Sequence, residues 1–265
     1  MKSRKKNRQH PISFGLPAFP AVEGGLLPRL LADFTSKTGI KAVLTRDDDL
    51  YAPGRQGKFD LLISHFGHRD TEGFVMGGFG LWPRTIFSNQ LCLAGPASDP
   101  ARVRGSHDLV TAFRKIAKAK APYIVNRTKG IRYLTETMWH AAGQPAKGSW
   151  LIDAGASKKE AFALAGERKA YVIWGLTPFL REEQASRNGL VPLLTSDPIL
   201  QRIMVATVVN PSRFPTANVM GATALQQFLL SPETQASILT TRYQGYDQAL
   251  WAPAGRHNAG AALPI

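Results

Sequence analysis

The chain contains very little cysteine. Cys92 is the single cysteine among 265 residues, which excludes an internal disulfide and offers no cysteine cluster for a metal. It lies between Leu91 and Leu93 in an apolar run, so we expect a buried, unreactive thiol rather than a nucleophile. The sequence also lacks any apolar stretch approaching the roughly 20 residues that cross a bilayer as a helix.

Acidic residues are scarce relative to basic ones. The chain has 33 Lys and Arg against 19 Asp and Glu, a formal net charge of +14. Such an excess favours contact with anions, whether a small oxyanion, phosphate lipids or nucleic acid, and carries no information about the fold. A hydrophobic content of 44% and a charged content of 20% are typical of a globular protein, long enough here for one large domain or two lobes.

The basic start of the chain has two interpretations. Its lysines and arginines resemble the charged region of an export signal, and residues 12–22 are mildly apolar. Gly15, Pro17 and Pro20 interrupt that segment, however, and make it a weak export core. We therefore expect a disordered basic tail over residues 1–11, followed by a first strand from Ile12. Without a convincing export signal, a cytoplasmic location stays open.

Strand-like and helix-like segments alternate along the chain. Extended segments are predicted at 41–45, 58–64, 85–95, 123–125, 150–152, 170–174 and 204–210. Helices are predicted from Leu26 to Gly39, from Asp108, from Ile131, from Ser157 with a capping-box spacing, from Thr177, over 217–230 and from Ser231. Residues 46–56 are predicted to form a polar loop. This alternation predicts an α/β fold with a parallel sheet.

The stretch from Pro122 to Gly143 is a candidate anion cradle. A short apolar strand is followed by the loop Asn126–Gly130 and then by apolar residues at helical spacing. The first turn of a helix leaves N–H groups unpaired and carries a partial positive charge, to which Arg127 and Lys129 add full charges. The alternative is that both cations are simply solvated on an ordinary loop.

Three other groups of residues have side chains of the kinds that bind metals or catalyse reactions. Asp47, Asp48 and Asp49 stand in a row, but no calcium-loop pattern surrounds them. His65 and His68 have no third ligand at a suitable spacing, and the Ser64-His65 pair lies in no Gly-x-Ser-x-Gly elbow. We therefore expect no metal site, no cofactor and no catalytic residue.

Segments spread over most of the chain resemble the tungstate/molybdate-type substrate-binding proteins of ABC importers. The first half contributes LLPRLLADFTSKTGIKAVL, GRQGKFDLLISH and GGFGLWPRTIFSNQLCLAGPASDPARV, and the second half AFRKIAKAKAPYIV, GERKAYVIWGLTPFL and VVNPSRFP. The resemblance implies a two-lobed type II periplasmic-binding-protein fold with two crossing strands. One lobe is expected to comprise residues 12–90 and 207–265, and the other residues 91–206.

The resemblance also implies a function and a set of ligand contacts. The chain would capture a small ligand between its lobes, an oxyanion such as tungstate or molybdate, for ABC-type uptake. The family's hydroxyl-rich first loop corresponds to Leu16–Ala21, which has no hydroxyl group. The family's contacts fall on Pro17, Ala18, Arg46, Asp47, Arg127, Thr128, Lys129, Gly130, Ser157, Lys158 and Trp174. Arg127, Thr128 and Gly130 preserve part of the family's second-lobe loop, whereas the carboxylate of Asp47 would repel an anion.

As partners, the resemblance implies a small-molecule ligand and a membrane ABC permease, with a monomeric binding protein outside the cytoplasm. The alternative function is a diverged binding-protein domain that acts as a sensor or a nucleic-acid-associated regulator, or that binds a different small molecule. The net charge favours nucleic acid, but the sequence has no helix-turn-helix, zinc-finger or stacking-platform motif.

Overall fold

The computed structural model describes residues 11–16, 25–47, 49–66, 69–242 and 250–253. Pro17, Ala18, Asp48, His68 and the basic tail up to residue 10 lie outside the described residues. The chain divides into two compact units, with borders between Ser88 and Asn89 and between Arg202 and Ile203. Both borders fall inside long strands, β4 (Arg84–Pro96) and β9 (Gln201–Val208).

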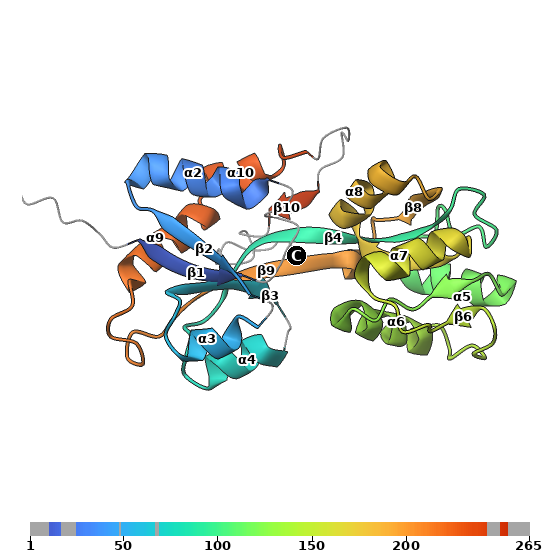
Figure 1. The fold of residues 1–265 in the computed structure, drawn as a ribbon, viewed down its shortest axis with the longest axis horizontal. Coiled ribbons are helices and arrows are strands. Elements are labelled where there is room, and N and C mark those ends of the chain that lie inside the picture. Colours follow the sequence, from blue (N-terminus) through green and yellow to red (C-terminus); the bar gives the residue numbers. More distant parts are fainter. Residues whose placement is uncertain (1–10, 17–24, 48, 67–68, 243–249, 254–265) are drawn as a thin grey trace, which may run out of the picture. The chain divides into compact units, whose positions relative to one another are not determined.

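Unit 1 contains a mostly parallel sheet between helices. β1 pairs in parallel with β2 and β3, and β9 closes this part of the sheet by pairing antiparallel with β3. The strands are β1 (Ile12–Leu16), β2 (Ala42–Arg46) and β3 (Leu61–His65). Figure 1 shows two helix groups on opposite faces: α2 (Leu26–Thr38), α9 (Val219–Leu230) and α10 (Pro232–Ile238) on one, α3 (Tyr51–Arg55) and α4 (Arg69–Met76) on the other.

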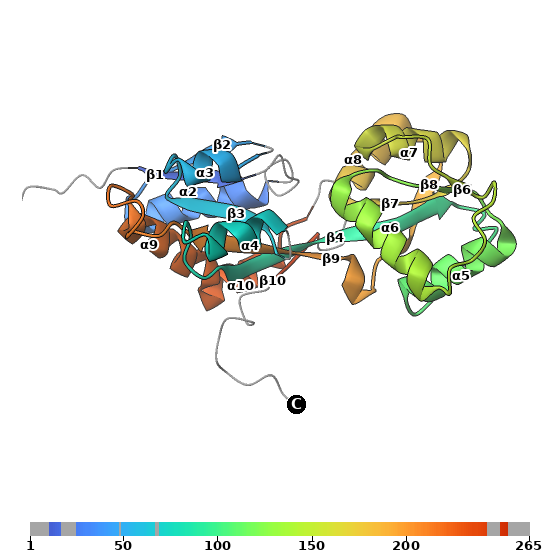
Figure 2. The ribbon, with the colours of Figure 1, turned by 90° about the horizontal axis from the view of Figure 1, so that it is seen from below.

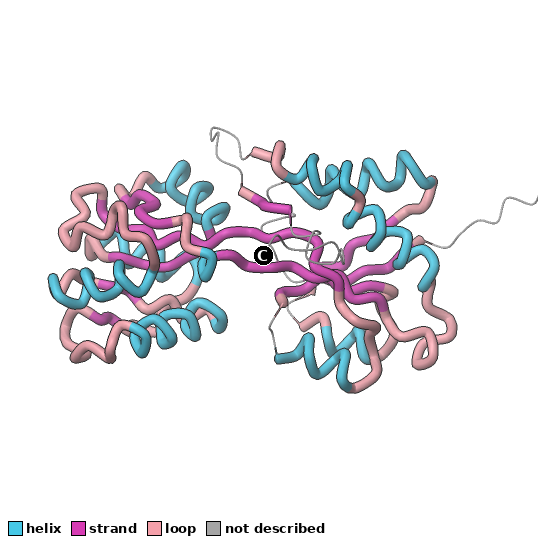
Figure 3. The backbone as a smooth tube through the Cα atoms, turned by 180° about the vertical axis from the view of Figure 1, so that it is seen from behind, coloured by secondary structure: helices cyan, strands magenta, loops and turns pink. Residues whose placement is uncertain are grey.

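Unit 2 is built in the same layered way. β5 (Tyr123–Ile124) pairs in parallel with β6 (Leu151–Ile152) and β7 (Tyr171–Gly175), while β4 runs antiparallel to β7 and to β8 (Leu190–Leu194). In Figure 2, α5 (Leu109–Ala119) and α6 (Lys129–Ala141) cover one face, and α7 (Lys158–Glu167) and α8 (Leu176–Ser186) the other. A 3-10 turn, η1 (Pro198–Leu200), precedes β9, and β10 (Trp251–Pro253) pairs with β4. Figure 3 shows helices flanking the strands in each unit.

The two faces of the unit 2 sheet are packed by different aromatic side chains. Tyr123 and Tyr171 are partners in register, both fully buried, and Phe113 of α5 packs against Tyr123 with ring centroids 5.2 Å apart. Because alternate residues of a strand face opposite sides, Trp174 points to the other face, where it contacts Phe162 of α7 at 5.1 Å. The indole of Trp174 is therefore part of the core.

Several sequence predictions about helix ends are confirmed. α2 ends at Gly39, whose φ of 72° is the left-handed conformation that glycine adopts without strain. Asp108 caps α5 by accepting the N–H of Thr111, and Ser231 caps α10 by accepting the N–H of Thr234. The mixed α/β class and the parallel pairing of β1 to β3 are also as predicted.

Three predictions about local structure are wrong. The polar loop 46–56 contains α3, because Asp49 accepts the N–H groups of Tyr51 and Ala52 at the start of that helix. α8 begins at Leu176 rather than at Thr177. Its N-cap is Gly175, over which the ring of Pro178 lies so closely that a Cβ would be 2.8 Å from it. Ser157 is the N-cap of α7 but makes no capping hydrogen bond with its side chain, so the capping box does not form.

Candidate anion-binding site

The carboxyl ends of β5, β6 and β7 lie side by side in unit 2, because the three strands are parallel neighbours. Asn126, fully buried after β5, connects the chain segments that follow them. Its Nδ2 donates to the carbonyl of Ile173 at 3.2 Å, and its Oδ1 accepts the N–H groups of Thr128 at 3.0 Å and Lys158 at 3.2 Å. One amide side chain therefore fixes the starts of α6 and α7 relative to β7.

Among the described residues, no side chain caps the N-terminus of α6. Thr128 is its N-cap but makes no capping hydrogen bond with its side chain, and the first turn contains no acidic residue. The hydroxyl of Thr128 instead accepts the N–H of Lys158 at 3.3 Å. The first-turn N–H groups of Lys129 and Gly130 have no acceptor within the helix. Together with the helix dipole, they form an end that suits an anion.

Arg127 already has a counter-ion within unit 2. Its Nε lies 2.7 Å from Oδ1 of Asp153, and its Nη2 lies 3.0 Å from Oδ2, a two-bond pairing. The hydrogen bond from Arg127 holds the pKa of the Asp153 carboxyl below its usual range. The same bond raises the pKa of Arg127. The sequence named Arg127 as a contact for the anion; in the structure its charge is paired with Asp153, and its contact with a ligand stays a prediction.

Arg202 is a cation at the same place that the sequence analysis missed. A Cβ built on Gly130 would lie 2.7 Å from Nη1 and 2.8 Å from Nη2 of Arg202, so the guanidinium lies directly against the first turn of α6. Burial lowers the pKa of Arg202, although a guanidinium stays protonated at neutral pH. The extended segment was predicted to begin at Met204, two residues too late to include it. A single arginine at the head of an apolar run was the available signal.

The first-unit residues expected in the site are placed at the end of β2. Arg46 and Asp47 are exposed, and Asp47 Oδ1 accepts the N–H of Asp49 at 3.0 Å. Asp49 in turn caps α3, so these two carboxylates serve the chain's own N–H groups. Within the described residues no group of histidine, cysteine and acidic side chains is arranged to hold a metal.

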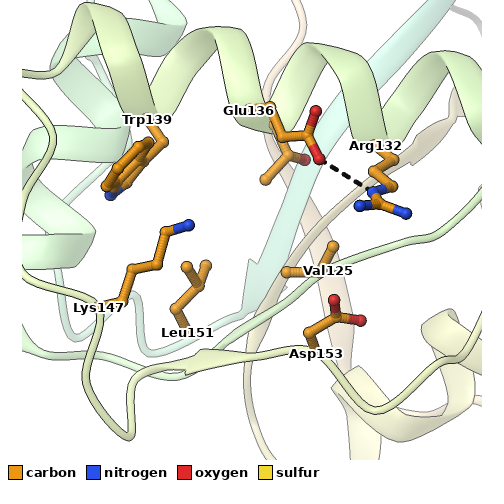
Figure 4. Close-up of a pocket in the computed structure, with 8 residues that line it drawn as sticks. Val125, Arg132, Glu136, Trp139, Lys147, Leu151 and Asp153 are labelled. Carbon is orange, nitrogen blue, oxygen red and sulfur yellow. Dashed lines mark hydrogen bonds and ion pairs between the residues drawn. The ribbon is translucent and has the colours of Figure 1, made fainter.

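A pocket of about 250 Å³ lies beside α6 rather than at its N-terminus (Figure 4). Val125 and Leu151 form apolar parts of its wall. Its charged residues are already engaged: Arg132 pairs with Glu136 at 2.9 Å, and the ammonium of Lys147 lies 4.2 Å from the ring centre of Trp139. Asp153, which also lines it, binds Arg127. The pocket therefore offers no uncompensated cation to an anionic ligand.

The sequence and the structure of the chain can be compared with those of known proteins. No family model matches the chain. It is 28% identical over 236 residues to the tungstate-binding protein TupA of Peptoclostridium acidaminophilum, covering 87% of this chain and 82% of that relative. The structure of TupA from Desulfovibrio alaskensis G20 matches with a TM-score of 0.83 at 26% identity, covering 92% of this chain and 99% of that one. The chain is a homologue of tungstate-binding proteins.

A second solved structure matches this chain at an identity that supports the fold only. The tungstate ABC transporter protein from Geobacter sulfurreducens matches with a TM-score of 0.70 at 24% identity, over 86% of this chain and 97% of that one. The type II periplasmic-binding-protein fold that the resemblance implied is thereby confirmed. These relatives are named as tungstate-binding proteins, which does not favour the nucleic-acid-associated alternative. In the described part of the chain, no helix has the length and apolarity needed to cross a bilayer.

Proposed function

We propose that the chain is a solute-binding protein that captures a tetrahedral oxyanion, such as tungstate or molybdate, for uptake by an ABC importer. The observation that carries the proposal is the start of α6, where unpaired N–H groups and a guanidinium meet without a carboxylate in the helix's first turn. Homology to tungstate-binding proteins supports the same ligand class. Binding of this kind requires no cofactor, no metal and no catalytic residue.

Each residue of the unit 2 site would have a distinct role. The N–H groups of Lys129 and Gly130 would donate to oxygens of the anion, and the N-terminus of α7, with Ser157 and Lys158, would add donors and charge. The Arg127–Asp153 pair would hold the loop before α6 in place rather than neutralise the ligand. For Pro17, Ala18, Arg46 and Asp47 a contribution remains a prediction from the sequence, and Trp174 would act through packing.

The proposal also covers the compartment in which the protein acts and the partner to which it delivers its ligand. By homology, the protein would act outside the cytoplasm as a monomer and would deliver its ligand to a membrane permease. Closure on the ligand would be a population shift, because the anion binds one conformation more tightly than another.

Isothermal titration calorimetry of the full chain, with a thermal-shift assay, tests the function. The panel is tungstate, molybdate, sulfate, phosphate, organic acids and cationic solutes. We expect one-site binding of a tetrahedral oxyanion. It should stabilise the folded protein by about 2.7 kcal/mol when the free anion is at a hundred times its Kd. A response to an amine or an apolar solute, with none to any oxyanion, would contradict the proposed ligand class.

A further inference from the structure

The guanidinium of Arg202 is held in an electrostatically unfavourable place. It is largely removed from water, and burial already acts against its charged form. It lies against the first turn of α6, where the helix dipole is also positive. A charge placed in this way raises the free energy of the folded protein unless an opposite charge balances it.

The described part of the chain contains no balancing partner for Arg202, neither an ion pair nor a hydrogen bond. Three other arginines of unit 2 do have partners for their guanidinium groups. Arg127 pairs with Asp153, and Arg132 pairs with Glu136. Arg114 donates to the carbonyls of Ala141 and Ala142. The guanidinium of Arg202 lies against Gly130, where a Cβ would be 2.7 Å from Nη1, so a larger residue there would force the end of the arginine side chain to move.

We propose that Arg202 is a ligand-binding residue that sets the preference of the site for a doubly charged oxyanion; this inference rests on the proposed function. Its planar fork of N–H donors matches two oxygens of a tetrahedral anion, while the N–H groups at the start of α6 reach the others. The anion would neutralise the guanidinium and the helix end at once. Because Asp153 balances Arg127, Arg202 is the arginine at the start of α6 whose charge the ligand would balance.

The test uses the full chain with Arg202 replaced by glutamine. Arg202→Gln should weaken tungstate binding in calorimetry by about 10- to 100-fold, the loss expected for charge-assisted hydrogen bonds. The same variant should melt at the wild-type temperature or above it without ligand, because an unpaired charge has been removed. A loss of tungstate affinity caused by misfolding would lower both quantities, so the two readouts separate a binding role from a structural one.

The experiment also includes a second anion and a control variant. Perrhenate is a tetrahedral anion of single charge, and Arg202→Gln should reduce the ratio of tungstate to perrhenate affinity. Arg132→Gln is the matched control: it removes an arginine from α6 that is exposed and paired with Glu136, and tungstate affinity should not change.

The outcomes distinguish the two proposals. If the wild type binds tungstate or molybdate and Arg202→Gln binds equally well, Arg202 is not a ligand contact while the proposed function stands. An unchanged ratio of tungstate to perrhenate overturns its role in charge selection. A wild type that binds no oxyanion in the panel overturns the function and this inference together.

Discussion

The N-termini of α5 and α6, two neighbouring helices of unit 2, are completed in opposite ways. At α5, Asp108 accepts the N–H of Thr111 and Asp197 accepts the N–H of Leu109, both at 2.6 Å. At α6, Thr128 makes no capping hydrogen bond with its side chain and no carboxylate stands in the first turn. A guanidinium, which repels the helix dipole, lies against it instead.

This difference separates a structural helix end from a functional one. Two carboxylates satisfy the start of α5 and stabilise the fold whether or not a ligand is present. On the proposed function, the start of α6 would gain an equivalent partner when an anion binds, so its stabilisation would depend on the ligand. Positive charge gathered without compensation is costly in the free protein and useful for binding, a trade that is common at functional sites.

Removing Asp197 should show most clearly how much a carboxylate at the start of α5 stabilises the fold. Its carboxylate is buried and also accepts the N–H of Ile199 at 3.0 Å. Asp197→Ala should lower the free energy of unfolding by about 2 to 4 kcal/mol, because two N–H groups lose a charged acceptor. Urea unfolding followed by circular dichroism measures the loss. Asp108→Ala, which removes a less buried cap, should cost only about 1 kcal/mol. Equal losses for the two variants would contradict the ranking.

A second test places at the N-cap of α6 a carboxylate like the one that caps α5. Thr128→Asp places a carboxylate at the N-cap, where it can accept first-turn N–H groups and balance Arg202. Tungstate affinity should fall by at least about 30-fold, close to 2 kcal/mol, because the carboxylate occupies the donors and repels the anion. Stability without ligand should rise by about 0.5 to 1 kcal/mol.

Thr128→Ser is the control for that substitution, since it keeps the hydroxyl and adds no charge; its tungstate affinity should stay within about threefold of the wild type. Calorimetry and urea unfolding measure both variants. If Thr128→Asp retains full affinity, the start of α6 is not where the anion binds.

The sequence predicted the elements around the site better than the contacts within it. The apolar strand at Tyr123, the loop after it and the amphipathic helix of α6 follow from local periodicity. So does the cap at Asp108, where an acidic residue directly precedes an apolar helical pattern. These features depend on residues close together in the chain, which is why one sequence is sufficient to predict them.

The charge balance of the site depends on pairs distant in the chain, which local patterns do not reveal. The pairing of Arg127 with Asp153, 26 positions away, could not be predicted from the sequence. Arg202 reaches Gly130 of α6 from the distant strand β9, so its place in the chain, at the head of an apolar run, did not indicate the contact. Trp174 looked available to a ligand, whereas the alternation of β7 turns it toward Phe162. In each case tertiary contacts decide which charge is free.

The Arg127–Asp153 pair should make a small contribution to the stability of the fold, and this contribution should depend on pH. Because the pKa of Asp153 is held below its usual value, the pair stabilises the fold above the usual carboxyl pKa near 3.9. This contribution is lost as the pH falls through the lower pKa of the folded protein. With 45% of Arg127 and 39% of Asp153 exposed, solvent screening should keep the effect small.

Asp153→Asn should therefore be slightly less stable than the wild type in urea at pH 6, and the difference should shrink as the pH falls below the usual carboxyl pKa and through the lower pKa of the folded protein. Its tungstate affinity should rise or stay the same, because Arg127 then becomes an additional uncompensated cation near α6. A marked loss of affinity would show instead that the paired geometry of Arg127 positions the loop before the helix. Arg127 would then act through Asp153, and the charge of the ligand would be balanced by Arg202 together with Lys158.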